Sequence, residues 1–252
     1  GLTGLTGYTD GLPRQMGGTW ADPLTAVTAN FAILAALHHR AETGEGQHID
    51  ISQCEATMAQ LPEALMDYAM NDRVRRPTGN RDEAMAPHGL YRCRGEDKWI
   101  AIAVSNQAEW EALCDVLGNP NWTKEERFSY ELGRWQNQDE LDRLIEAWTK
   151  EHEHYAVMNL LQKAGVPAGP CLDAEELYSD PHMQARGHFI EIEHPEVGKR
   201  PSVAVPWHIS GVPSPDYFHA PTLGEYNEYV FHELLGLPRE RIAQLIEEKV
   251  IY

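Results

Sequence analysis

Asp22 is the residue of this sequence best placed to do chemistry. It ends a glycine-rich stretch that includes Gly17 and Gly18, and an apolar segment opens at Pro23. A carboxylate at the start of a helix lies near free backbone N–H groups and is favoured by the helix dipole. Asp22 is therefore either an ordinary helix cap or a nucleophile that a substrate approaches across the glycines. The local pattern alone favours the cap.

The element that must position Asp22 is a helix predicted from Pro23 to about Arg40. Its residues are apolar or small nearly all round, which predicts a buried helix. Two glycines, Gly44 and Gly46, end it. One face carries the larger apolar side chains, Leu24, Val27, Phe31 and Leu34.

Further elements follow this helix. Residues 48–52 alternate in hydrophobicity and predict a short strand. Residues 54–71 predict a second helix, which Pro62 should kink or restart. Residues 72–89 are polar and broken by Gly and Pro, so that we expect a linker over 73–89. Positive charge is concentrated there in an acidic protein, at Arg73, Arg75, Arg76 and Arg81.

A second unit is predicted over residues 90–173. Leu90–Arg94 and Lys98–Val104 should form a hairpin, and the second of these strands is apolar on both faces, which predicts an internal strand. Residues 166–171 should leave the unit as an extended segment. Three helical stripes are expected between these parts, carried by Trp110, Leu113, Cys114 and Leu117, by Leu141, Leu144, Ile145 and Trp148, and by Val157, Leu160, Leu161 and Ala164.

The last part, 174–252, should return from this unit. We expect a short helix over 174–184, a second hairpin made by Phe189–Glu193 and Ser202–Pro206, and two helices over roughly 224–235 and 238–248. The mixture of strands and helices along the whole chain indicates an α/β or α+β fold.

The composition of the chain excludes several classes of binding partner. The 252 residues carry a formal charge of −18, which argues against nucleic acid or an anionic membrane surface as partner. No apolar run is long enough to span a bilayer. The four cysteines form no C-x-x-C pair, which favours free thiols in a reducing, cytoplasmic compartment.

Other kinds of site find little support. The twelve histidines show no metal-ligand spacing with a third ligand, and His152 with His154 is better explained as a solvated pair. No dinucleotide fingerprint, P-loop or G-x-S-x-G elbow occurs. The arginines of the linker could hold a phosphate, although a solvated linker explains them as well.

The motifs taken together are more specific than any one of them. The chain resembles the class III CoA-transferase family over essentially its whole length, and the matching stretches fall in family order. These stretches are residues 7–13, 17–22, 32–40, 43–52, 79–81, 86–93, 165–170 and 220–225.

The resemblance implies a mechanism and a fold. Asp22 matches the family's nucleophilic aspartate, which attacks an acyl-CoA thioester and passes CoA to an acceptor carboxylic acid through a covalent aspartyl intermediate. It implies an α/β fold in which residues 1–72 are the remainder of a Rossmann-like large domain, 90–173 a small α+β domain, and 174–252 a return segment that packs on the large domain. Residues expected to line the substrate are Gly17, Gly18, Gln53, Ala86, Pro87 and His88.

The chain departs from the family pattern in two places. Some relatives carry a glycine-rich lid where this chain has residues 83–89, and His88 is a substitute contact in that segment. Relatives also carry an N-terminal half with most of the CoA-binding residues, which this chain, starting at Gly1 without Met, is expected to lack. The chain alone is therefore expected to complete its pocket poorly.

Alternatives to CoA transfer stay open at this point. Racemases of the same superfamily place a glutamate where this chain has Asn106, which cannot serve as a carboxylate base. A companion subunit or a truncated, non-catalytic chain is the third possibility. The resemblance further implies an interlocked homodimer crossing near 72–89 and 166–173. Acyl-CoA and a small carboxylic acid are the expected partners, with no metal and no permanently bound cofactor.

Overall fold

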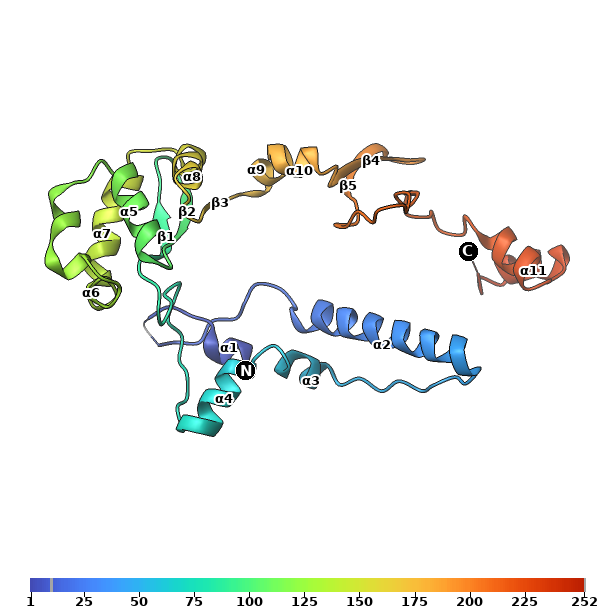
Figure 1. The fold of residues 1–252 in the computed structure, drawn as a ribbon. Helices are drawn as coiled ribbons and strands as arrows, with labels where there is room; N and C mark the ends of the chain where they lie inside the picture. The colour runs from blue at the N-terminus through green and yellow to red at the C-terminus, as the bar shows by residue number, and fades with distance from the viewer. Residues whose placement is uncertain (10, 252) are drawn as a thin grey trace. The chain divides into compact units, whose positions relative to one another are not determined.

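The computed structural model describes residues 1–9 and 11–251 of the chain. Its contacts divide the chain into two units, Gly1–Cys171 and Leu172–Tyr252 (Figure 1). The turn expected at Asp10 lies outside the described residues. Both helices and strands occur, as the sequence predicts, while the Rossmann-like character and the finer domain boundaries stay predictions.

Helix α2, Ala21–Thr43, is the longest element of the first unit and follows the short helix α1, Leu2–Leu5. It starts two residues before the predicted Pro23 and ends three residues after the predicted Arg40. The end is set as expected, because Gly44 takes a left-handed conformation with φ 80° and its N–H bonds the carbonyl of Arg40 at 2.9 Å.

The prediction that this helix is buried is wrong for the described structure. No residue of α2 is buried, and Phe31 is 76% exposed. The physical reason is a shortage of packing partners: in the described part of the chain, α3, Gln53–Met58, is the element that packs beside it (Figure 1). The apolar face therefore remains exposed at Val27, Phe31 and Leu34.

The strand predicted over 48–52 is also absent. These residues are extended but pair with no strand among those that the structure describes. Alternation signals a strand only when a partner strand is available to satisfy its N–H and C=O groups. The second predicted helix is confirmed in two pieces, α3 and α4, Pro62–Asn71, with Pro62 at the first helical position of α4.

A three-stranded antiparallel sheet forms the centre of the first unit's core. Strands β1, His88–Arg92, β2, Trp99–Ala103, and β3, Ala168–Cys171, lie in the order β1-β2-β3. The prediction of an internal strand at β2 is confirmed. The segment expected to leave this unit as an extended chain instead supplies β3, with Ala101 opposite Gly169.

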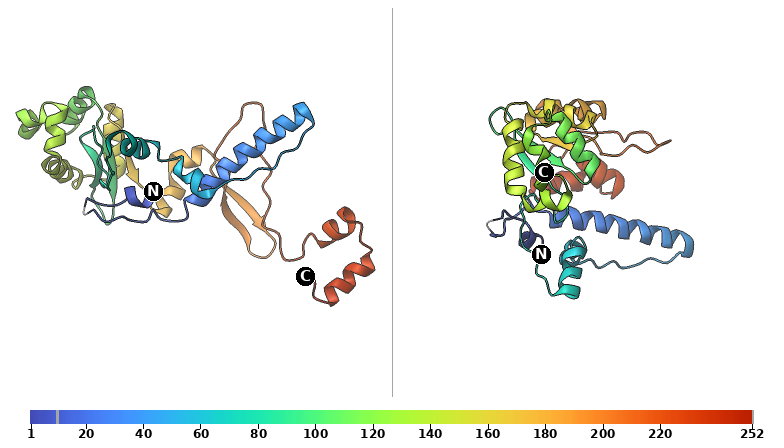
Figure 2. Two further views of the ribbon diagram at one scale, coloured as in Figure 1. Left: turned by 90° about the horizontal axis from the view of Figure 1, so that it is seen from below. Right: turned by 60° about the vertical axis from the view of Figure 1, so that its left-hand side comes forward.

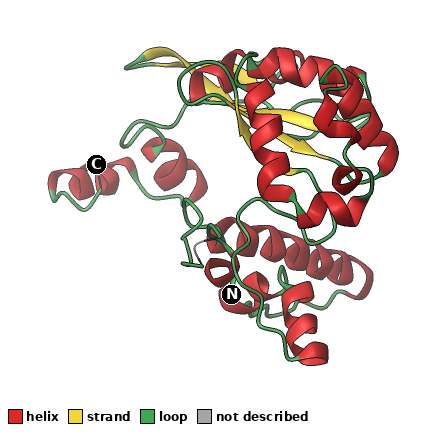
Figure 3. Ribbon diagram, turned by 90° about the vertical axis from the view of Figure 1, so that its left-hand side faces the viewer, coloured by secondary structure: helices red, strands yellow, loops and turns green. Residues whose placement is uncertain are grey.

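Helices bury one face of this sheet, and the three predicted stripes all lead into the core (Figure 3). The buried side chains include Trp110, Leu113, Leu141, Ile145, Val157 and Leu161. The elements are α5, Gln107–Val116, η1, Asn121–Lys124, η2, Glu126–Phe128, α6, Glu131–Gln136, α7, Gln138–Thr149, and α8, His154–Lys163.

The second unit consists of short elements (Figure 2). The helix predicted over 174–184 is divided, because Asp180 caps a new helix that starts with Pro181. In the hairpin, His194 pairs with Gly198, so the second strand starts four residues earlier than predicted. Its elements are α9, Ala174–Ser179, α10, Pro181–Ala185, β4, Phe189–His194, β5, Gly198–Val203, the π-helix η3, Glu228–Leu234, and α11, Arg239–Glu247.

Candidate functional site

Asp22 is the second residue of α2 and does not cap it. The cap position belongs to Trp20, whose side chain makes no capping hydrogen bond. The N–H of Asp22 already donates to the carbonyl of Thr19 at 3.1 Å, so the residue lies within the first turn. The expectation of an N-cap is therefore wrong, because the helix begins at Ala21, two residues before the start at Pro23 that this role requires. The Asp22 carboxylate is left available for other partners.

The partner that the carboxylate finds is Gln53. Its side-chain amide Nε2 donates a hydrogen bond to Oδ1 of Asp22, across 31 residues of sequence. Gln53 is the first residue of α3, and Ser52 caps that helix by accepting from the N–H of Glu55 at 3.3 Å. The start of α3 therefore holds an amide donor against the start of α2.

A cavity of about 350 Å³ opens beside this pair. Asp22, Gln53, Thr57 and Gly18 are among the residues that line it. Gly18 has φ +80°, a conformation that a side chain would strain, while Gly17 is not part of the lining. Oδ1 is held by the amide, and the Asp22 side chain borders an open space that Gly18 also lines. An exposed carboxylate of this kind can accept a proton or attack an electrophilic carbon.

Residues 86–88 belong to a different part of the first unit. Ala86 and Pro87 are buried and take no part in the Asp22 cavity. His88 opens strand β1 and lines a separate cavity of about 510 Å³. Of the predicted lining residues, Gly18 and Gln53 thus line the cavity together with Asp22, Gly17 adjoins it without lining it, and residues 86–88 do not line it.

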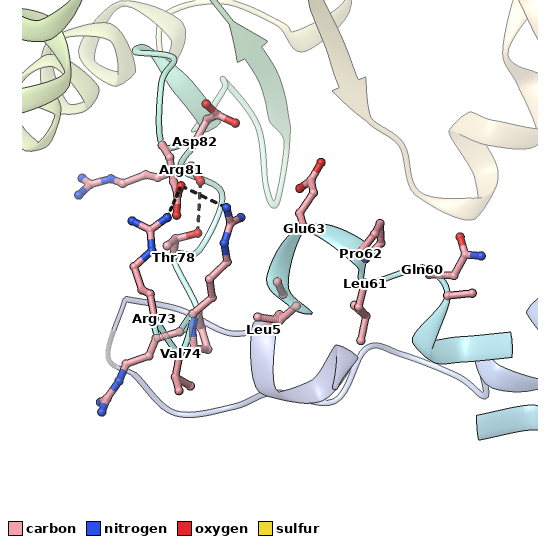
Figure 4. Close-up of a pocket in the computed structure, with 16 residues that line it drawn as sticks. Leu5, Gln60, Leu61, Pro62, Glu63, Arg73, Val74, Thr78, Arg81 and Asp82 are labelled. Carbon is pink, nitrogen blue, oxygen red and sulfur yellow. Dashed lines mark hydrogen bonds and ion pairs between the residues drawn. The ribbon is translucent and has the colours of Figure 1, made fainter. Parts of the chain in front are cut away.

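Three of the four arginines of the predicted linker, Arg73, Arg75 and Arg81, bind carboxylates of this chain, and Figure 4 shows the cavity that they border. Nε of Arg73 and Nε of Arg75 donate to Oδ2 of Asp67 at 2.6 and 3.0 Å. Hydrogen bonds from Asn71 and Arg73 hold the pKa of Asp67 at about 2, below its ordinary 3.8. These arginines border a cavity of about 680 Å³. Because this pair is already occupied, the geometry does not support a phosphate site built on it.

Sequence reasoning missed Asp67. It is a buried residue of α4, and its burial together with its contacts to Asn71, Arg73 and Arg75 distinguishes it from other acidic residues of this chain. A possible signal was the acidic residue placed one helical turn before Asn71 and shortly before two arginines.

Asn106, the residue weighed above against the racemase alternative, has a local role. Its side-chain oxygen accepts from the N–H of Glu109 at 2.9 Å and so caps α5. Glu109 in turn accepts from the N–H of Ser105 at 2.7 Å. The side chain of Asn106 is therefore occupied in starting a helix.

Residues 1–9 and 11–251 contain neither a cluster of metal-binding side chains nor a helix fit to span a membrane. No three His, Cys, Asp or Glu side chains there are grouped so that they could hold a metal ion. His152 bonds the Trp148 carbonyl at 2.8 Å and stacks on that ring. None of the described helices combines the length and the hydropathy needed to cross a bilayer.

Comparison with known proteins decides the family. The model of CoA-transferase family III matches residues 1–227. The chain belongs to CoA-transferase family III. A succinyl-CoA–D-citramalate CoA-transferase of Chloroflexus aurantiacus is 32% identical over the whole of this chain and 62% of its own length. A formyl-CoA:oxalate CoA-transferase of Bradyrhizobium diazoefficiens is 28% identical over 97% of this chain and 62% of its own.

A solved structure agrees with this assignment. The crystal structure of a CAIB/BAIF family protein from Brucella suis matches 92% of this chain and 60% of its own, with a TM-score of 0.81 and 30% identity. The chain thus spans about 62% of the length of the two curated relatives.

Proposed function

We propose that the protein in which this chain occurs transfers coenzyme A from an acyl-CoA thioester to an acceptor carboxylic acid, with Asp22 as covalent nucleophile. The observation that carries this proposal is the Asp22 carboxylate beside an open cavity, held by Gln53 through one oxygen, in a chain of CoA-transferase family III. The relatives that carry CoA-transferase names support the reaction class.

In the first half of the reaction, Oδ2 of Asp22 attacks the thioester carbonyl carbon. The carbon–sulfur bond breaks, which gives an aspartyl–acyl anhydride and free CoA thiolate. The thiolate then attacks the carbonyl carbon of the aspartyl group. The donor acid leaves as its carboxylate, and Asp22 carries CoA as a thioester.

In the second half, a carboxylate oxygen of the acceptor attacks the aspartyl thioester and releases CoA thiolate again. The resulting anhydride joins Asp22 to the acceptor. Attack of the thiolate on the acceptor's acyl carbon forms the new acyl-CoA and restores the Asp22 carboxylate. Thioester energy is conserved because no step uses water, and CoA is a substrate that leaves with the product.

The surroundings of Asp22 support this chemistry. The N-terminus of a 23-residue helix favours the ionised carboxylate that the attack needs. Gly18 presents backbone without a side chain at the border of the cavity, which gives a thioester room to approach. We propose Gly17 as a neighbour that keeps this approach open, since an added Cβ there would meet no heavy atom within 4 Å.

The decisive experiment traps the intermediate in the whole protein. It is incubated with succinyl-CoA, treated with hydroxylamine, digested and examined by mass spectrometry. We expect modification of the peptide that contains Asp22, and loss of both the adduct and CoA transfer in Asp22→Asn. Asp50→Asn is a matched control, because that carboxylate lies outside the Asp22 cavity. Full activity in Asp22→Asn would overturn the proposal.

The same preparation tests the two alternatives. A racemase would exchange the α-proton of an acyl-CoA in deuterated water without transferring CoA to an acid. A companion subunit would show neither reaction and would purify with a second, different chain. We further propose a homodimer for the whole protein in the cytoplasm, since the apolar face of α2 needs a partner. Light scattering of the purified protein tests the dimer.

A further inference from the structure

Two cavities of the second unit share two lining residues, Val205 and His208. The smaller cavity, of about 260 Å³, lies beside α10, and the larger, of about 390 Å³, is formed by the chain that follows β5. Every described residue that lines them belongs to the second unit, and neither cavity shares a lining residue with the one at Asp22. The function proposed above makes no use of them.

Basic side chains line the smaller cavity. They are those of His182, Arg186, His188 and His208, and no acidic residue is among the described residues around it. The guanidinium of Arg186 forms no ion pair with a described residue, and the imidazoles of His182 and His188 have no hydrogen-bond partner among them. The carboxylate of Asp180, which precedes α10, caps that helix. An unpaired guanidinium beside imidazole N–H groups suits a carboxylate ligand.

Apolar side chains line the larger cavity. Trp207, Ile209 and Val212 are 59%, 57% and 57% exposed although each borders it. Its volume of about 390 Å³ lies within the range of small-molecule sites, about 300–1,000 Å³. Pro213 and Pro215 complete this wall, and none of the described lining residues is Asp, Glu, Lys or Arg. An apolar group placed here would remove these side chains from water, which is favourable.

Hydrogen bonds hold the walls of the smaller cavity in place. Nη2 of Arg186 donates to the carbonyl of Pro206 at 3.2 Å, and Nε2 of His208 lies 3.1 Å from the carbonyl oxygen of Arg186. A carbonyl only accepts, so Nε2 of His208 is the donor. The N–H of Ala204 donates to the carbonyl of His188 at 2.7 Å. These bonds order the site before a ligand arrives, and the other N–H groups of Arg186 remain for it.

From this geometry we infer that the two cavities bind a small carboxylic acid with an apolar body. Its carboxylate accepts N–H groups from Arg186 and from the imidazole of His182 or His188, and its apolar body covers Trp207 and Ile209. A hydrophilic anion such as phosphate leaves those two side chains in water and therefore gains less on binding. The site is built by the second unit and does not rest on the proposed function.

The test measures binding of phenylacetate, acetate and inorganic phosphate to the whole protein by equilibrium dialysis. We expect phenylacetate to bind about tenfold more tightly than acetate, or better, because its ring is removed from water. Its affinity should fall about tenfold or more in Arg186→Gln, which loses the charge, and in Trp207→Ala, which loses the apolar wall. The matched controls are Arg200→Gln and Phe218→Ala, at positions that line neither cavity, and both should bind as the parent protein does.

A photoreactive analogue, para-azidophenylacetate, locates the ligand in the parent protein, so that this readout does not depend on how well a variant folds. After irradiation and digestion, mass spectrometry should find the label on peptides that contain residues 182–188 or 205–212. An excess of phenylacetate should reduce this labelling. Label that is found only on other peptides would contradict the proposed site.

The outcomes separate this site from the proposed function. In Asp22→Asn, phenylacetate should bind with unchanged affinity whether or not CoA transfer is lost. Loss of binding in that variant would assign the ligand to Asp22 and overturn the site. Equal affinity for acetate and phenylacetate, tighter binding of phosphate, no detectable binding, or unchanged affinity in both Arg186→Gln and Trp207→Ala would refute it as well. In each of these cases the hydroxylamine experiment still decides the role of Asp22.

Discussion

Replacement of Gln53 by Met tests whether the held oxygen of Asp22 matters to the chemistry. Methionine keeps the length of the side chain and removes the amide that donates to Oδ1 of Asp22. The Asp22 carboxylate would then rotate freely, and the orientation in which Oδ2 can attack would be populated less often. We therefore expect kcat to fall while KM changes little, because the side-chain amide of Gln53 bonds Asp22, the proposed nucleophile.

The size of the effect follows from the kind of bond and its exposure. A hydrogen bond to a charged group contributes about 1.5–3 kcal/mol, or about 10- to 100-fold in rate. Asp22 and Gln53 are both exposed, so water competes for the same atoms and the lower end applies. We expect about a tenfold loss of kcat in Gln53→Met. The matched control is Gln60→Met, which removes an exposed amide that has no contact with Asp22.

The assay follows CoA transfer from succinyl-CoA to a range of carboxylic acids by liquid chromatography, with the hydroxylamine adduct as a second readout. Gln53→Glu adds an opposing test, because a second carboxylate beside Asp22 disfavours two charges at once and should make kcat depend on pH. Unchanged kcat in Gln53→Met, in a protein that loses activity in Asp22→Asn, would refute the positioning argument.

Three further predictions concern stability. The pKa of Asp67 is about 2 in the folded chain and ordinarily 3.8. Its contribution to the free energy of unfolding is therefore complete above about pH 4 and is lost as the pH falls toward 2. Asp67→Asn should make stability depend less on pH over that window, as measured by acid unfolding. Arg134→Met should cost about 1–3 kcal/mol and lower the melting temperature, because the carbonyls of Ala86 and Phe128 lose a buried donor. Ile145→Ala, at a fully buried position, should cost about 2–5 kcal/mol in urea unfolding.

The sequence predicted best those parts whose signals are local. The stripes of α5, α7 and α8 repeat at helical spacing, and most of their residues form the core as expected, whereas Leu160 and Ala164 of the third stripe are exposed. Pro62 and Gly44 set helix boundaries through their own backbone chemistry, which no distant residue has to supply. The internal position of β2 followed from apolar residues on both of its faces.

The failures share a dependence on partners far along the chain. Residues 48–52 alternate like a strand, but a ladder needs a second strand, and none of the described strands pairs with them. The apolar composition of α2 predicted burial, but composition shows only that a helix is able to pack against other elements. It does not show that such elements are present, and the side chains of α2 are exposed. The segment 168–171 read as a connection and became β3, because β2 offered it a free edge.

Asp22 shows how a shift of two residues in the start of a helix changes a chemical argument. Sequence patterns place helix ends within one or two residues, and within that margin Asp22 is either the cap or the second residue of the helix. In a capping carboxylate, one oxygen accepts hydrogen bonds from backbone N–H groups. At the second position, Asp22 instead meets an amide from 31 residues away, which no local pattern could predict. The interpretations of Asp22 as cap and as nucleophile therefore separate: the structure excludes the cap, and the role as nucleophile is the one we propose.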